Sequence, residues 1–224
     1  MEETFEEGRV LLIDKPSGWT SFDVVNKIRR TIKVKKVGHA GTLDPLATGL
    51  LIICTGKMTK QIDGYQAQEK EYTGFLGFGK TTPSIDLETP FDSEQDYSHL
   101  SPEMVNSALN NLTGKIMQIP PMYSAIRVEG KRMYLQARKG RTVELQPREV
   151  TVSAFEITSW DMPLVGFRIV CSKGTYIRSL VRDLGQAVNS GAYLHSLRRT
   201  RIGSFRVEDA ESVGDFVQKY QHSA

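Results

Sequence analysis

The stretch of sequence that decides the fold runs from Gly38 to Cys54 and reads GHAGTLDPLATGLLIIC. Its second half, Leu50-Leu51-Ile52-Ile53-Cys54, is a continuous apolar run, which is typical of a strand buried on both faces. Its first half is a loop in which Asp44 precedes Pro45 and is therefore held in extended backbone, outside a helix. Glycines 38, 41 and 49 allow tight turns and a close approach to a ligand. The stretch therefore predicts a carboxylate held rigidly on a loop that leads into a core strand.

The segments on either side of this stretch mix strands and helices. Strand patterns cover residues 9–13, 72–78, 150–160, 164–171 and 194–207. Helices are expected after Ser21, Ser101 and Thr175, each as the N-cap, with a short further helix over 131–139 that follows a hairpin. Residues 86–98 are acidic and rich in turn formers, which predicts a flexible loop. Because strands and helices interleave without strict alternation, we expect an α+β fold with a mixed, largely antiparallel sheet flanked by helices.

The composition is that of a globular protein. The 224 residues are 39% hydrophobic and 25% charged, and no run approaches the ~20 apolar residues needed to cross a bilayer. The acidic start lacks the order of a secretory signal, and Cys54 and Cys171 each end an apolar run as free, buried thiols would. We therefore expect a cytoplasmic protein with no membrane association. The four histidines make no ligand spacing with the cysteines, so no metal is expected.

Positive charge is concentrated in two segments. Residues 127–148 carry seven Lys and Arg against two Glu, and residues 168–206 carry eight against one Asp. Such segregation is expected when the partner is a polyphosphate, although a single charged run is more often a solvated face. Aromatic residues interleaved with both segments favour the nucleic-acid interpretation.

One motif points elsewhere. Residues 74–81, GFLGFGKT, fit the phosphate-loop pattern of nucleotide triphosphatases letter for letter. That loop requires a helix starting at its lysine, whereas Pro83 follows here and no helical periodicity resumes. We predict a strand that ends in a turn and no nucleotide-hydrolysing activity.

Asp44 has two interpretations when only its spacing is considered. It could cap a turn that begins at Pro45, or it could act as a nucleophile or cation stabiliser. A resemblance favours the second. The chain resembles the TruB-type tRNA pseudouridine-55 synthases in several motifs that occur in family order: DKPSGWTS at 14–21, GHAGTLDPLATG at 38–49, KEY at 70–72, PPMYSA at 120–125, CSKGTYIR at 171–178 and LRRT at 197–200.

This resemblance implies a reaction and a set of site residues. The reaction breaks the N1–C1′ bond of a uridine, turns the base and rejoins it through C5, so no cofactor is required. Asp44 is implied as the catalytic carboxylate, Arg178 as its ion-pair partner and Tyr72 as the residue that stacks on the uracil and removes the C5 proton. His39 is implied to assist base flipping. Substrate contacts are further implied for Lys15, Tyr176 and Leu197.

The resemblance also implies a function for the two basic segments. Arg138, Lys139 and Arg141 are expected to grip the backbone of the tRNA T arm, with Arg198, Arg199 and Arg201 along another wall. The expected organisation is a disordered acidic tail at 1–8, a catalytic domain at 9–212 with an RNA-binding insertion near 120–148, and a short helix and tail at 213–224. The C-terminal RNA-binding domain of the PUA type, which many relatives carry, is not recognised.

Two alternatives stay open beside uridine isomerisation at position 55 by a monomer. One is a helper of RNA folding whose binding matters more than its chemistry. The other is a pseudouridine synthase that acts on a different RNA. An Asp44→Asn variant distinguishes the first alternative, because only chemistry requires the carboxylate.

Overall fold

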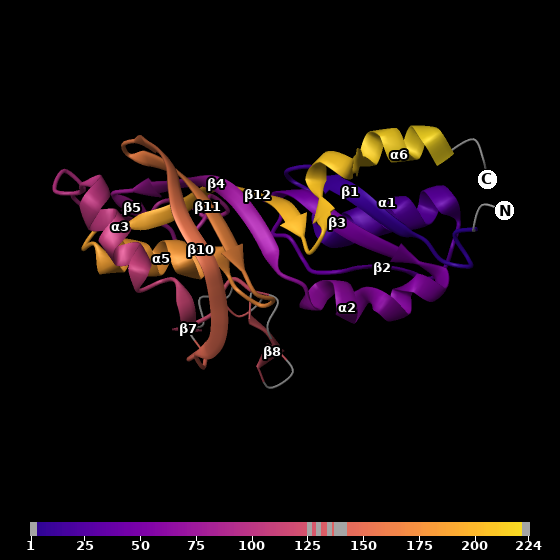
Figure 1. Cartoon of the computed structure of the whole chain (residues 1–224), viewed down its shortest axis with the longest axis horizontal. Coiled ribbons are helices and arrows are strands. Elements are labelled where there is room, and N and C mark those ends of the chain that lie inside the picture. Colours follow the sequence, from indigo (N-terminus) through magenta and orange to yellow (C-terminus); the bar gives the residue numbers. More distant parts are fainter. Residues whose placement is uncertain (1–3, 125–126, 129–130, 134–135, 137–142, 221–224) are drawn as a thin grey trace. The chain divides into compact units, whose positions relative to one another are not determined.

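A computed structural model of the chain describes residues 4–124, 127–128, 131–133, 136 and 143–220. The chain forms two compact units (Figure 1). The first unit contains residues 1–73 together with 197–224, and the second contains residues 74–196. The unit boundaries fall inside strands β4 (Lys70–Phe78) and β12 (Ala192–Ile202), so two strands pass from one unit into the other.

The first unit is built around β3 (Thr48–Thr55), the predicted core strand. Its strand order is β14-β1-β3-β12-β4, and β2 pairs with β3 while β13 pairs with β12. The pairings of β3 with β1 and β2 are antiparallel, and its pairing with β12 is parallel. The remaining strands are β1 (Val10–Lys15), β2 (Val37–His39), β13 (Phe205–Arg206) and β14 (Glu211–Ser212).

Two apolar cores cover the two faces of β3, which explains its unbroken apolar run. On one face Leu51 and Ile53 pack with α1 (Ser21–Ile32) and α6 (Val213–Tyr220). On the other face Leu50, Ile52 and Cys54 pack with side chains that include Ile202. The unit also holds α2 (Ile62–Ala67) and 3-10 turns at Gly56–Gln61 and Val207–Asp209.

The second unit contains a long antiparallel hairpin of β10 (Arg148–Asp161) and β11 (Leu164–Cys171) (Figure 1). The strand order here is β12-β4-β11-β10-β7, where β7 is Gly114–Gln118. Helix α3 (Pro102–Asn110) packs against β10 and against α5 (Ile177–Ala187). The further elements are β5 (Lys80–Thr81), β6 (Ser93–Glu94), β8 (Arg127–Val128) and β9 (Lys131–Arg132). The α+β class and the mixed, largely antiparallel sheet are thus confirmed.

Several local predictions are confirmed. Ser101 caps α3 through its side chain, with Pro102 at the first helical position, and α6 covers the expected residues. The hairpin of β8 and β9 is present, whereas most of the helix predicted over 131–139 lies outside the described residues. The motif at 74–81 forms the end of β4, a turn at Gly79 with φ 83°, and the two residues of β5, so a phosphate loop is excluded.

Two predicted helix caps are wrong. The cap of α1 is Thr20, which forms a capping box with Asp23, and the residue before α5 is Tyr176, not Thr175. Residues 86–98 are largely loop, as expected, with β6 inside them paired to β5, and their flexibility stays a prediction. In the acidic tail Phe5 contacts Phe216, and the disorder expected for residues 1–8 also stays a prediction. Both cysteines are free and buried. No helix in the described ranges combines the length and the apolar character that crossing a membrane requires.

Candidate active site

The loop that carries Asp44 connects β2 to β3 and is held by its own turns. Asp44 is half-buried, and its carbonyl accepts a hydrogen bond of 3.1 Å from the N–H of Ala47. Gly41 in the loop and Gly49 near the start of β3 have φ angles of 95° and 103°, which disfavour residues with a side chain. Two of the three predicted glycines, Gly41 and Gly49, therefore have the backbone conformation that the sequence suggested.

Ser21 fixes the residue just before Asp44. Its buried hydroxyl accepts a hydrogen bond of 2.9 Å from the N–H of Leu43 and donates one of 3.3 Å to the Leu43 carbonyl. Its side chain is therefore not available to cap α1, and Thr20 takes that role. A single hydroxyl thus satisfies both main-chain groups of the residue next to Asp44.

Lys15 holds the other side of the loop. Its side chain is 0% exposed, and its ammonium group donates to the carbonyls of Trp19 at 2.6 Å, Pro16 at 2.9 Å and Pro45 at 3.2 Å. The pKa of Lys15 is lowered to about 8: burial is the main cause, the charge of Asp44 opposes it, and the charge of Arg199 adds to it. An ammonium enclosed by three carbonyls is a poor candidate for the direct substrate contact that the sequence suggested.

Arg199, on β12, contacts the same loop and was expected to face RNA. The structure contradicts this, because the residue is 1% exposed. Its Nε donates to the carbonyl of Leu50 at 2.8 Å and its Nη2 to that of Gly41 at 3.1 Å. Its neighbours Arg198 and Arg201 are half-buried and form ion pairs with Asp14 and Glu69 at 2.6 and 2.8 Å. The expected basic wall therefore does not present these three side chains freely.

Three further candidates lie in the first unit. His39 ends β2 and is half-buried; burial, and then the charge of Arg199, lower its pKa, while a backbone hydrogen bond at Gly41 raises it. Tyr72 on β4 and Leu197 on β12 are buried at 8% and 9% exposure. Asp44, His39 and Lys15 thus belong to one electrostatically connected region, and the substrate roles of Tyr72 and Leu197 stay predictions.

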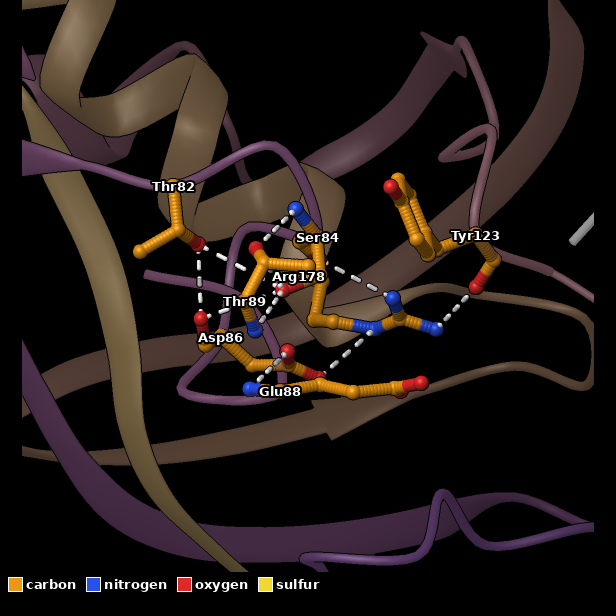
Figure 2. A network of polar contacts seen from close by, with 7 residues as sticks. All are labelled: Thr82, Ser84, Asp86, Glu88, Thr89, Tyr123 and Arg178. Atoms are coloured by element: carbon orange, nitrogen blue, oxygen red, sulfur yellow. Dashed lines mark hydrogen bonds and ion pairs between the residues drawn. The ribbon is translucent and has the colours of Figure 1, made fainter. Parts of the chain in front are cut away.

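Arg178, at the start of α5 in the second unit, lies in a buried polar network (Figure 2). It is 3% exposed and is therefore not a surface cation. Its Nη1 donates to the Ser84 carbonyl at 3.0 Å, its Nη2 to the Tyr123 carbonyl at 2.7 Å, and its Nε lies 3.7 Å from a carboxylate oxygen of Asp86. The expected ion pair with Asp44, a residue of the first unit, stays a prediction.

The network around Arg178 is fixed by hydroxyl groups. Thr82 and Ser84 donate to the carbonyl of Asp86 at 2.6 and 3.1 Å, and the hydroxyls of Ser84 and Thr89 lie 2.8 Å apart. The Asp86 carboxylate also accepts a hydrogen bond of 3.0 Å from the N–H of Glu88 (Figure 2). These contacts hold the Asp86 carboxylate and the Ser84 carbonyl where the guanidinium of Arg178 meets them.

Tyr176 precedes α5 and is fixed by its main chain. Its N–H donates to the Gln118 side chain at 2.8 Å, and its carbonyl accepts from the same amide at 3.1 Å. The guanidinium of Arg148 lies 4.7 Å from the ring centre, a cation–π arrangement. The three predicted RNA contacts Arg138, Lys139 and Arg141 lie outside the described residues.

Sequence reasoning missed Ser21, Asp86 and the actual placement of Arg199. No local signal could have identified them, since each acts on a residue distant in the chain. The apolar residues that follow Ser21 at helical spacing, such as Val24, Val25 and Ile28, made Ser21 look like a simple N-cap.

Comparison with known proteins assigns the family. The profile of the N-terminal domain of TruB family pseudouridylate synthases matches residues 29–177, and that of the tRNA pseudouridylate synthase B C-terminal domain matches residues 178–223. The chain is 53% identical to the tRNA pseudouridine synthase B of Phocaeicola vulgatus over 95% of this chain and 93% of the relative. It is 50% identical to that of Parabacteroides distasonis over 96% and 95%.

Solved structures agree. A chain in the crystal structure of a Cbf5-Nop10-Gar1 complex superimposes with a TM-score of 0.76 at 28% identity. A chain of an H/ACA RNP bound to a substrate RNA containing 2′-deoxyuridine gives 0.72 at 27%. Both matches cover 97% of this chain, which spans only 55% and 54% of those chains. From the profiles and the relatives together, the chain belongs to the TruB family of pseudouridine synthases.

Proposed function

We propose that this chain converts uridine to pseudouridine in tRNA, at position 55 of the T loop, with Asp44 as the catalytic carboxylate. The observation that carries the assignment of Asp44 is the way its loop is held. Ser21 fixes the preceding residue, and the buried cations Lys15 and Arg199 bond to carbonyls on both sides of it. Its relatives' names, tRNA pseudouridine synthase B, support the reaction and the class of substrate.

The chemistry matches a fixed carboxylate. The N1–C1′ bond breaks, a C1′–C5 bond forms, and the C5 proton is lost while N1 gains one, so atoms and charge balance without a co-reactant. Positive charge develops at C1′ when the glycosidic bond breaks, and a carboxylate stabilises or attacks such a centre. Preorganisation of Asp44 lowers the barrier because the group need not be reoriented in the transition state.

Other residues take the remaining roles in this proposal. Tyr72 stacks on the uracil and removes the C5 proton after rejoining. His39, whose lowered pKa keeps its imidazole neutral near pH 7, helps hold the flipped nucleotide. Arg178 pairs with the Asp44 carboxylate, and Tyr176 and Leu197 contact the substrate. Lys15 acts through the loop that it holds, because its ammonium group is enclosed by carbonyls.

The RNA is gripped, in the same proposal, by Arg138, Lys139 and Arg141. Charge reversal at Lys139 and Arg141 weakens tRNA binding and lowers its dependence on salt, because fewer counterions are released per complex. Measurement of the tRNA Kd over a series of salt concentrations tests this, and an unchanged salt slope contradicts it. We further propose that the protein acts as a monomer in the cytoplasm.

The experiment that tests the function is pseudouridine formation on an unmodified tRNA transcript, with the product position mapped. Wild type is compared with Asp44→Asn, which keeps the side-chain size and removes the negative charge. We expect product at position 55 with wild type only. Tight tRNA binding without product from wild type would refute the enzymatic assignment and favour the RNA-folding helper. Product elsewhere in the RNA would refute the target position.

A further inference from the structure

Arg199 is a buried cation of unusual placement. Among the described residues it is the largest that is fully buried, and its guanidinium donates hydrogen bonds to two main-chain carbonyls. Among the residues that the structure describes, no carboxylate forms an ion pair with it, whereas its neighbours Arg198 and Arg201 each have one. Burying a charge without an opposite charge is costly, and an apolar residue of similar volume is often as stabilising. The stability of β12 alone therefore does not account for an arginine here.

The two carbonyls belong to the two ends of one loop. Gly41 lies three residues before Asp44, and Leu50 lies six residues after it on β3. One planar guanidinium contacts both, and its fixed geometry sets the separation of the ends of the loop. The backbone is equally constrained, because Arg199 pairs with Gly49 in the parallel β12–β3 ladder.

The charge of Arg199 also acts within this region. It lowers the pKa of His39 and that of Lys15, so its positive potential extends over both flanks of the loop.

We propose that Arg199 is a positioning residue for the isomerisation: it ties Gly41 to Leu50, fixes the path of the chain through Asp44 and places a buried positive charge beside His39 and Lys15. This inference rests on the proposed function of Asp44. It assigns Arg199 no contact with RNA, since the side chain is buried.

The competing explanation is that Arg199 only stabilises the fold, and Arg29 provides a matched control. Arg29 lies in the same unit and is half-buried, and it donates to the Val37 carbonyl at 3.2 Å and to the Asn26 side chain at 3.1 Å. Arg29→Gln therefore removes an arginine-to-carbonyl bond that does not involve the loop of Asp44. Its effect measures what loss of such a bond does to stability alone.

The experiment compares Arg199→Gln, Arg199→Lys and Arg29→Gln with wild type in four measurements: kcat on tRNA, tRNA Kd, thermal unfolding and the pKa of His39 by NMR. For Arg199→Gln we expect kcat to fall about 10²-fold, as for a catalytic group displaced by about 1 Å, with an unchanged Kd. The pKa of His39 rises, because a neighbouring positive charge is lost. For Arg29→Gln we expect a lower Tm with wild-type kcat and His39 pKa.

Arg199→Lys separates the two parts of the role. Lysine keeps the charge but cannot span both carbonyls with a planar fork, so the His39 pKa stays near that of wild type while kcat still falls. If the Arg199 variants had a lower Tm but the kcat and the His39 pKa of wild type, as expected for Arg29→Gln, the inference would be overturned. Failure of wild type to make pseudouridine would refute the proposed function instead, and the His39 titration still tests the electrostatic part.

Discussion

Gly49→Ala is the substitution for which the structure gives the clearest magnitude. Gly49 has a φ of 103°, and a Cβ there would lie 2.3 Å from the carbonyl oxygen and 2.7 Å from the nitrogen of Arg199. Since real Cβ contacts stay beyond 3.0 Å, the two strands must separate by at least 3.0 − 2.3 = 0.7 Å. The strained backbone alone costs about 1–3 kcal/mol, which lowers Tm by about 2–12 °C for a chain of this size.

The same displacement reaches Asp44, because Gly49 ends its loop. We expect kcat to fall by on the order of 10²-fold, the loss that follows a misplacement of about 1 Å. Thermal unfolding and single-turnover pseudouridine formation measure the two effects. The control is Gly64→Ala in α2, where a Cβ meets nothing within 4 Å. Because alanine stabilises a helix relative to glycine by about 0.5–1 kcal/mol, this variant should have a slightly higher Tm and an unchanged kcat. If Gly49→Ala kept the Tm and kcat of wild type, the reasoning from backbone contact would be refuted.

Three further predictions concern buried polar groups. Ser21→Ala leaves the N–H of Leu43 without its acceptor, so we expect it to lower the free energy of unfolding by about 1–3 kcal/mol and to lower kcat. The cap variant Thr20→Ala should lower that free energy by about 1 kcal/mol and keep kcat. Urea unfolding and turnover on tRNA measure the two effects, and equal kcat losses in both variants would argue against a loop role for Ser21. The pKa of His39 lies below its ordinary 6.5, so the unfolded chain binds more protons at this residue. Stability should therefore drop as pH falls below 6.5, and His39→Gln should flatten that part of a urea-unfolding series; an unaltered slope contradicts the prediction. Burial raises the pKa of Cys54 to about 11, so iodoacetamide near pH 8 should label it in urea but not in the native protein. Mass spectrometry of the Cys54 peptide measures the labelling, and a labelled peptide from native protein would contradict the prediction.

Elements that depend on nearby residues were predictable from the sequence. The apolar run of β3 was identified because both of its faces are buried, and the short C-terminal helix expected within 213–224 corresponds to α6, whose buried residues Val213 and Phe216 recur at helical spacing. The phosphate-loop pattern was rejected correctly, since Pro83 prevents the helix that such a loop needs.

Features that depend on distant partners were not predictable. Ser21 looks like a helix cap in the sequence, but its hydroxyl bonds to Leu43, 22 residues away. Arg199 sits among other basic residues, and only the pairing of β12 with β3 turns its guanidinium toward the carbonyls of Gly41 and Leu50. A strand sequence does not reveal whether a charged side chain points into a core or into solvent when its acceptors are main-chain groups.

The division of the chain into units has a consequence for the order of synthesis. Residues 74–196 form one unit from a continuous segment, whereas the other unit combines residues 1–73 with 197–224. The loop of Asp44 is therefore translated early, but its tether Arg199 leaves the ribosome 199 − 44 = 155 residues later. Continuous segments fold as they emerge, and contacts between distant residues form slowly. In pulse-labelled hydrogen exchange during refolding, amides of β10 and β11 should gain protection before those of β3. If Arg199 positions Asp44 as proposed, the nascent chain converts no uridine before residue 199 has been translated and β12 has paired with β3.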